Sequence, residues 1–282
     1  MAIDNFIPEI WAAQVFQDFD RASIIGGLCN RDYEGEIAAG GDTVRITAIG
    51  PVTITSYTKN STSYLSQQTL TDAQTTLVID QQKYFNFQID DIDKAQQKPK
   101  VMGEAMRKAA VAMAQTVDTY VAALYSFAGA GSSATLTVAA TDYGVLTVFG
   151  RANQLLSEND CPTEGRYALI SPYVQAQMVK QNIMITMGAN QPLFTNGYLG
   201  RYMGFDIYVS NNLACGTTHA AAGSVHECMF GTKDAITLAF QINKVEAYRN
   251  PYQFGDAVKG LLLYGAKVIQ PKALCTIEVR SS

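Results

Sequence analysis

The stretch VMGEAMRKAAVAMAQTVDTYVAALYSFA, residues 101–128, carries the clearest structural signal in the chain. Pro99 lies near its start, and Gly129-Ala130-Gly131 follows it as a helix terminator. Its apolar side chains recur at steps of three and four residues, the spacing of one helix face: Met102, Met106, Ala109, Met113, Thr116 or Val117, Tyr120 and Leu124. The pattern predicts one long amphipathic helix over residues 100–128.

Upstream of this helix, residues 42–90 follow a period of two. Val44, Ile46 and Ala48 alternate with threonine and arginine, and the alternation resumes at 52–55 after a Gly-Pro break. Apolar runs return at residues 77–80 and 84–89, beyond a long polar stretch rich in Ser and Thr. The pattern predicts a long two-stranded arm with a polar tip. Because a lone hairpin is marginal in water, this arm should rest on another surface, such as a neighbouring subunit.

The N-terminal part, residues 1–38, predicts an extended arm with a short helix that begins near Pro8. Ile10, Trp11, Val15 and Phe19 recur near helical spacing, and Trp11 is the only tryptophan of the chain. An apolar arm of this kind needs a surface to lie on.

The remainder of the chain mixes helices and strands without repeats and without a linker between independent domains. Helices are expected at 142–158 and from Pro172 to about 182, with a strand at 167–170 and a Gly/Asn-rich loop at 184–201. Further strands are expected at 205–209, 227–231, 235–248 (as two strands) and 257–280. The fold class is therefore α+β with an extended arm.

Composition favours an oligomer. Of the 282 residues 48% are hydrophobic and only 16% are charged, against about 25% charged residues in an average soluble domain. Low charge suits a protein that hides much of its surface against copies of itself. The formal net charge is −4 and no basic run occurs, which argues against nucleic-acid binding.

The sequence also lacks the marks of export and of a membrane span. The N-terminus has no signal-peptide pattern, and no apolar run approaches the roughly 18 residues that cross a bilayer. The five cysteines are an odd number without a C-x-x-C pair, which argues against a disulfide framework. We therefore expect synthesis in a cytoplasm.

Three patterns imitate chemical sites. Both histidines fall in a C-x3-H-x6-H-x-C set whose spacing is looser than that of structural zinc sites: Cys215, His219, His226 and Cys228. Gly129-Ala130-Gly131 begins a G-x-G-x-x-A match, but it follows a helix instead of a strand. Asp90, Asp91 and Asp93 could bind a cation, although carboxylates that favour a helix N-terminus explain them more simply.

The sequence contains no G-x-S-x-G, Walker or H-E-x-x-H motif, so a hydrolase is the weakest of the functional alternatives. Asn60-Ser61-Thr62 matches a glycosylation sequon, but nothing indicates secretion. We expect no enzyme activity, no catalytic residue, no cofactor and no metal.

A series of short motifs, in one order from end to end, resembles the major capsid proteins of tailed bacteriophages. Each motif is weak alone, but the ordered set is specific. They include residues 5–11 (NFIPEIW), 27–37 (GLCNRDYEGEI), 90–95 (DDIDKA), 204–212 (GFDIYVSNN), 231–236 (GTKDAI) and 254–260 (FGDAVKG), with shorter matches at 41–44, 58–60, 78–81 and 246–249.

The resemblance implies an α+β Hong Kong 97-like capsid fold. On that pattern, residues 1–41 form an N-terminal arm, 42–90 an extended hairpin (the E-loop), and 91–140 the spine helix with a peripheral domain. Residues 141–230 form an axial domain, and 231–282 return as strands through both domains. The loop at 184–201 would lie near the capsomer centre.

The function that the resemblance implies is structural: self-assembly into the icosahedral head that encloses double-stranded phage DNA, as hexamers and pentamers. Expected partners are a separate scaffolding protein, a portal and a decoration protein, with assembly in the host bacterial cytoplasm and no membrane or sequence-specific nucleic-acid binding. A covalent crosslink through Lys59 is conceivable, although the chain looks more like non-crosslinking capsids. The alternative is an encapsulin-like compartment shell, which shares the fold.

Three sets of residues are expected at contacts between subunits. The hairpin contributes Tyr57, Lys59, Asn60 and Tyr64, and the N-terminal arm contributes Phe6, Ile7 and Trp11. The turn at the tip of the peripheral domain, near three-fold and quasi-three-fold axes, contributes Arg249, Asn250, Tyr252 and Phe254.

Overall fold

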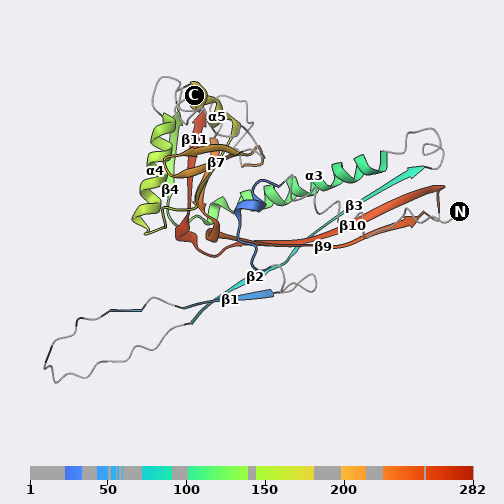
Figure 1. The fold of residues 1–282 in the computed structure, drawn as a ribbon, viewed down its shortest axis with the longest axis horizontal. Coiled ribbons are helices and arrows are strands. Elements are labelled where there is room, and N and C mark those ends of the chain that lie inside the picture. Colours follow the sequence, from blue (N-terminus) through green and yellow to red (C-terminus); the bar gives the residue numbers. More distant parts are fainter. Residues whose placement is uncertain are drawn as a thin grey trace.

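The structure is a computed structural model. It describes residues 23–33, 43–49, 52–54, 56, 59, 72–90, 101–138, 144–180, 198–213, 225–250 and 252–281. These residues form a body with two sheets and a two-stranded ribbon that projects from it (Figure 1).

The predicted long helix is confirmed as α3 (Val101–Ala122), which continues into a 3-10 helix, η3 (Ala123–Phe127). Its buried face carries Met106, Ala110, Met113, Ala114, Val117 and Val121. The choice between Thr116 and Val117 is settled, because Thr116 is exposed and Val117 is buried. The alanines at 110 and 114 allow a close approach to the sheet beneath the helix.

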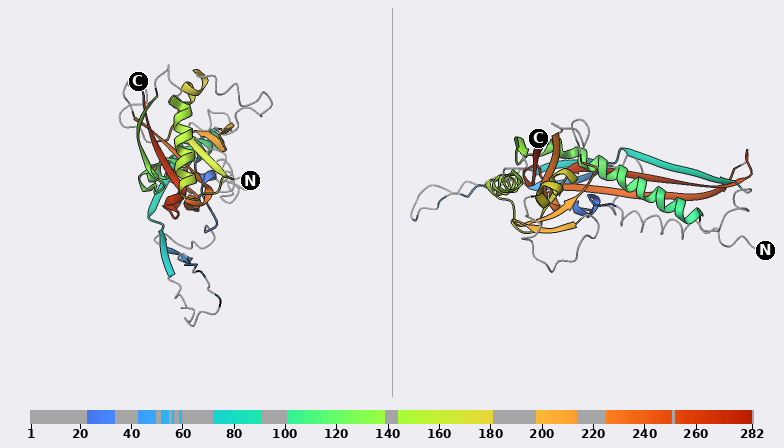
Figure 2. Two further views of the ribbon diagram at one scale, coloured as in Figure 1. Left: turned by 90° about the vertical axis from the view of Figure 1, so that its left-hand side faces the viewer. Right: turned by 90° about the horizontal axis from the view of Figure 1, so that it is seen from above.

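That sheet has three antiparallel strands in the order β3 (Gln81–Asp90), β10 (Gly255–Val268) and β9 (Ile236–Arg249). α3 runs along one of its faces (Figures 1 and 2). Val258, Leu262 and Tyr264 of β10 meet the helix in a shared apolar core. Residues 236–249 form one strand, where the sequence predicted two at 235–248. A register shift between Leu261 and Leu262 interrupts the pairing without ending the strand.

The two-stranded ribbon pairs β1 (Thr43–Ile49) with β2 (Asp72–Val78), antiparallel from Thr43 opposite Val78 to Ile49 opposite Asp72. It leads away from the body (Figure 1). The prediction of a hairpin is confirmed for these strands, but the run at 84–89 belongs elsewhere. It lies in β3 and pairs with β10, because its alternate phenylalanines Phe85 and Phe87 pack into the core under α3.

The second sheet has six strands in the order β4-β11-β8-β5-β7-β6. Their bounds are β4 (Ser132–Val138), β5 (Arg166–Ile170), β6 (Tyr198–Tyr202), β7 (Phe205–Val209), β8 (Val225–Thr232) and β11 (Leu274–Ser281). α4 (Gly144–Glu158) and α5 (Pro172–Lys180) pack on it around a core that includes Phe149, Phe205 and Phe230. The end of the predicted 184–201 loop is strand, and residues 181–197 lie outside the described residues.

The side chain of Arg166 is buried next to the end of α4. The Arg166 guanidinium donates to the carbonyl oxygens of Cys161 and Pro162, both at 2.7 Å, and to Asn153 Oδ1 at 2.5 Å. The two carbonyls lie in the loop after α4 and Asn153 lies on the helix, so the buried guanidinium is satisfied by hydrogen bonds and links the helix to this loop.

Short segments connect the two sheets. The 3-10 helix η4 (Lys233–Ala235) follows β8, and η5 (Pro271–Ala273) precedes β11. The chain therefore leaves the six-stranded sheet after β8, runs through β9 and β10 of the three-stranded sheet, and returns at β11. The Gly129–Gly131 segment joins η3 to β4, which is not the strand-to-helix context of a dinucleotide site. Within the described part of the chain, no helix is long and apolar enough to cross a bilayer.

Candidate assembly surfaces

The ribbon exposes apolar side chains beyond its paired strands. Val44, Ile46 and Leu77 are buried at its root, whereas Val52 and Ile54 are 63% and 94% exposed. Lys59 is exposed as well. The other hairpin candidates, Tyr57, Asn60 and Tyr64, lie outside the described residues. Exposure of an apolar side chain such as Ile54 to water is unfavourable, and burial against a partner would remove that cost. Residues 52–54 are therefore a candidate contact surface.

The turn between β9 and β10 is a second exposed apolar surface. Tyr252 is 94% exposed and Phe254 is 80% exposed. Together with Arg249, Asn250 and Gln253 they line a hollow of about 410 Å³. The predicted tip residues Arg249, Asn250, Tyr252 and Phe254 are therefore neighbours in space.

Hydrogen bonds hold this turn in shape. Asn250 Oδ1 accepts from the Tyr252 backbone N–H at 3.0 Å, and Asn250 Nδ2 donates to Gln88 Oε1 on β3 at 2.7 Å. The Asn250 backbone N–H donates to the Gly255 carbonyl at 3.2 Å, and Arg249 lies 3.7 Å from the Asp256 carboxylate. These bonds restrain the backbone that carries the two aromatic rings, so less backbone entropy remains to be lost on binding.

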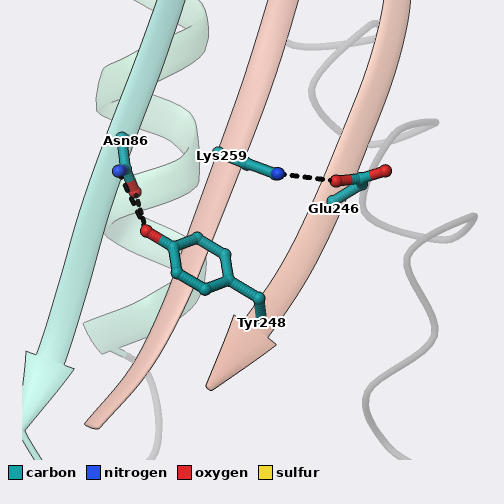
Figure 3. A network of polar contacts seen from close by, with 4 residues as sticks. All are labelled: Asn86, Glu246, Tyr248 and Lys259. Carbon is teal, nitrogen blue, oxygen red and sulfur yellow. Dashed lines mark hydrogen bonds and ion pairs between the residues drawn. The ribbon is translucent and has the colours of Figure 1, made fainter. Parts of the chain in front are cut away.

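The sheet face opposite α3 carries a network of polar contacts (Figure 3). The Tyr248 hydroxyl exchanges hydrogen bonds with the Asn86 side chain across β10, at 3.0 and 3.2 Å. Lys259 forms an ion pair with Glu246 at 2.8 Å. Beside them Tyr84 is 79% exposed at a groove of about 510 Å³. This face combines fixed polar groups with an uncovered ring, which is the composition of a partner-binding surface.

The N-terminal segment is tied to α3 through one carboxylate. Asp118 is 1% exposed, and it accepts from Ser23 Oγ at 2.6 Å, from the Ile24 N–H at 2.9 Å and from the Gly26 N–H at 3.2 Å. Ser23 and Ile24 precede a 3-10 helix, η1 (Gly26–Leu28), and Gly26 is its first residue. Burial raises the pKa of the Asp118 carboxyl above its usual range, although the hydrogen bonds act in the opposite direction.

Beyond η1, the backbone of Asn30 pairs with β9. Its N–H donates to the Ile236 carbonyl and its carbonyl accepts from the Leu238 N–H, both at 2.9 Å. These bonds attach the described N-terminal segment, residues 23–33, to β9, whereas the predicted arm residues Phe6, Ile7 and Trp11 lie outside the described residues.

The sequence reasoning missed Asp118 and Tyr84. For Asp118 the predicted apolar stripe gave no signal, because it ran through Met113, Val117 and Tyr120, and residue 118 lies about 100° around the helix from Val117, away from that stripe. A buried carboxylate must be satisfied by donors, which points to a partner segment. For Tyr84 the alternation predicted a strand, but nothing indicated which face would stay uncovered.

Of the zinc-like set, the structure describes His226 and Cys228. His226 and Cys228 lie on β8 with their side chains buried, and the His226 ring stacks on Tyr173 at 5.0 Å. Burial raises the pKa of the Cys228 thiol to about 12, and the thiols of Cys29 and Cys275 likewise. These thiols stay protonated and unreactive near neutral pH.

Metal binding finds no support in the described residues either. Nowhere in the ranges that the structure describes do three His, Cys, Asp or Glu side chains gather as a metal site would require. Cys215, His219, Asp91 and Asp93 lie outside these ranges, and Asp90 is the last residue of β3.

Comparisons with known proteins agree with one another. The model of a family described as phage capsid protein matches residues 73–277, well over half of the chain. A structure from Mycobacterium phage Che8 is similar with a TM-score of 0.72 and 24% identity, over 90% of both chains. The capsid structure of Cyanophage P-SCSP1u gives 0.69 and 19%, over 93% of this chain and 89% of that one.

A third similar structure comes from outside the phages. The virus-like particle from Pyrococcus furiosus gives a TM-score of 0.60 at 10% identity, over 96% of this chain and 98% of that one. A comparison with curated protein sequences finds no match.

Proposed function

The chain belongs to the phage capsid protein family and has the Hong Kong 97-like fold of tailed-phage shells, and on that premise we propose how its parts build the shell. It is a structural capsid protein. The observation that carries this conclusion is the family match over residues 73–277, which spans the ribbon strand β2, α3 and both sheets.

We propose a division that differs from the expected bounds, because β3 pairs with β10 instead of extending the hairpin and β4 pairs with β11 of the six-stranded sheet. The β1–β2 ribbon and the residues between its strands form the E-loop, and α3 with the three-stranded sheet forms the peripheral domain. The six-stranded sheet with α4 and α5 forms the axial domain. The apolar core around α4 lies within the six-stranded unit and supports this division, whereas the core under α3 also takes in Leu169, Met229 and Leu274, where the two units pack together.

Contacts between subunits use the extremities of the chain. The hairpin, with Tyr57, Lys59, Asn60 and Tyr64, lies on the peripheral domain of a neighbour. The arm residues Phe6, Ile7 and Trp11 cover apolar surface of an adjacent subunit, and the tip at Arg249–Phe254 meets other tips. The exposure of Ile54, Tyr252 and Phe254 supports this assignment, because an isolated subunit leaves them in water.

The fold alone does not identify a phage head, because a structure described as a virus-like particle from Pyrococcus furiosus shares it. The family match favours the phage head, with DNA as its content. We propose assembly from hexamers and pentamers in the host cytoplasm, with a separate scaffolding protein, a portal and a decoration protein, and no enzymatic step by this chain.

Electron microscopy and light scattering of the purified chain, alone and with its scaffolding protein, test the proposal. We expect capsomers or closed shells. A monodisperse monomer at all concentrations, with scaffold present, would contradict it. A content of loaded cargo protein instead of DNA in shells isolated from cells would favour the compartment alternative.

A further inference from the structure

The root of the hairpin contacts the backbone of the three-stranded sheet directly. After β2 ends at Val78, the chain passes over β10 before it enters β3. A Cβ atom at Gly265 of β10 would overlap the Val78 carbonyl oxygen and lie 3.0 Å from Ile79 Cα. These obstacles are backbone atoms, so no side-chain rotation can relieve them. Glycine at 265 is what permits the two chains to lie this close.

A small apolar core surrounds this crossing. It joins Val44, Ile46, Leu77 and Ile79 from the hairpin side with Ala239 of β9 and Leu263 of β10. Leu77 and Ile79 are fully buried in the subunit itself. Because close-packed apolar contacts resist small displacements, the root is a packed joint and not a loose hinge.

Polar ties flank the crossing on both sides. Lys267 Nζ donates to the Thr76 carbonyl oxygen of β2 at 2.7 Å. The Tyr120 hydroxyl of α3 hydrogen-bonds the Asp80 carboxylate, immediately after the crossing, and the Tyr120 ring packs edge-on against Tyr264 at 5.3 Å. The hairpin root is therefore linked to β10 on one side and to α3 on the other.

We propose that Gly265, Lys267 and Tyr120 are positioning residues that fix the direction in which the hairpin leaves the body, and so control closure of the shell. The inference rests on the proposed role of the hairpin as an intersubunit contact. A seven-residue strand is roughly 23 Å long, so a tilt of about 10° at the root moves its far end by roughly 4 Å. Such a displacement exceeds what a hydrogen bond tolerates.

Gly265→Ala is the direct test, and Gly150→Ala is its matched control. The added methyl group at 150, on α4, meets nothing within 4 Å. We expect both variants to fold by circular dichroism. We expect Gly265→Ala, but not Gly150→Ala, to reduce the yield of closed shells of wild-type diameter about tenfold or more, since each misplaced contact recurs around the shell.

A second measurement reads the hairpin direction itself in unassembled subunits. Lys59 and Glu158 are each replaced by a non-natural amino acid that carries a spin label, which avoids labelling the native cysteines. Pulsed electron paramagnetic resonance then measures the distance between the label on the hairpin and the label on the body. Gly265→Ala should shift this distance distribution, and Gly150→Ala should leave it unchanged. Should Gly265→Ala fail to fold, Lys267→Met and Tyr120→Phe take its place, because each removes one tie and keeps the side-chain body.

The inference is overturned if a folded Gly265→Ala subunit keeps the wild-type distance, or builds normal shells at wild-type yield. If Gly265→Ala does not fold, the inference is overturned when Lys267→Met and Tyr120→Phe both keep the wild-type distance or both build normal shells at wild-type yield. If shells form normally even when the hairpin is removed, the proposed contact itself has failed. If removal of the hairpin blocks shell formation but the variants at Gly265, Lys267 and Tyr120 assemble normally, only the proposed role of these three residues is wrong.

Discussion

The six-stranded unit and the projecting hairpin bury their apolar residues in different ways. Around α4 the phenylalanines and aliphatic side chains are enclosed within one subunit. In contrast, the four most exposed large apolar side chains of the described residues are Tyr84, Tyr252 and Phe254 of the three-stranded sheet and its tip, and Ile54 of the hairpin. The comparison indicates that the six-stranded unit is stabilised by its own core. It supports our proposal that neighbouring subunits cover the exposed side chains of the hairpin, the tip and the three-stranded sheet.

Phe149 gives the largest expected effect on the stability of the subunit. Its ring centroid lies 5.5 to 6.1 Å from those of Tyr202, Phe205 and Phe230. Phe149→Ala should lower the free energy of unfolding of the subunit by about 3–5 kcal/mol, because it leaves a cavity among rings that cannot close up. Urea titration followed by circular dichroism measures this loss.

Ile54→Ser is the matched substitution on the hairpin. It should leave the urea midpoint of the unassembled subunit unchanged and lower the yield of shells, because this side chain is 94% exposed in the subunit and buries almost no apolar surface there. A large loss of subunit stability in Ile54→Ser would show that the hairpin belongs to the core, against the comparison.

Asp118 tests the junction between body and arm. Asp118→Ala should cost about 2–3 kcal/mol of unfolding free energy, because the donors on Ser23, Ile24 and Gly26 lose their acceptor. Tryptic cleavage after Arg31 should accelerate as well. Asp118→Asn keeps one acceptor oxygen and should lose less. Equal stability and equal cleavage in all three proteins would remove Asp118 as the anchor.

Glu227 makes the stability of the six-stranded sheet depend on pH. It lies directly opposite Glu278, on β8 and β11, and burial together with the Glu278 charge raises its pKa to about 7. In the unfolded chain a glutamate ionises near pH 4.5, so the folded state holds the extra proton between these values. The stability that this proton contributes is present at low pH and is lost as the pH rises through 7.

Glu227→Gln should therefore match the wild type near pH 5 and be more stable by about 1–2 kcal/mol near pH 8.5, in urea titrations of the subunit. A difference that is constant with pH would mean that Glu227 ionises normally in the folded sheet.

Much of the fold could be predicted from the sequence, because α3, α4, α5 and most strands follow local periodicity. The partner of β3 could not, since alternation at Tyr84–Gln88 marks a strand without naming the distant β10 against which it pairs. The sequence predicted two strands where β9 is one, for a related reason. The register shift in its pairing with β10 does not end the strand, and that depends on the distant partner. The tip residues came from the family resemblance, since no local pattern distinguishes Tyr252 and Phe254 from core aromatics.

Replacement of residues 53–72 by a short Gly-Ser turn tests the central claim most directly. The account predicts a subunit with wild-type circular dichroism and an unchanged urea midpoint that forms no closed shells by electron microscopy, with or without scaffold. Normal shells of wild-type thermal stability from this variant would contradict the claim that the hairpin is completed by, and clamps, the neighbouring subunit.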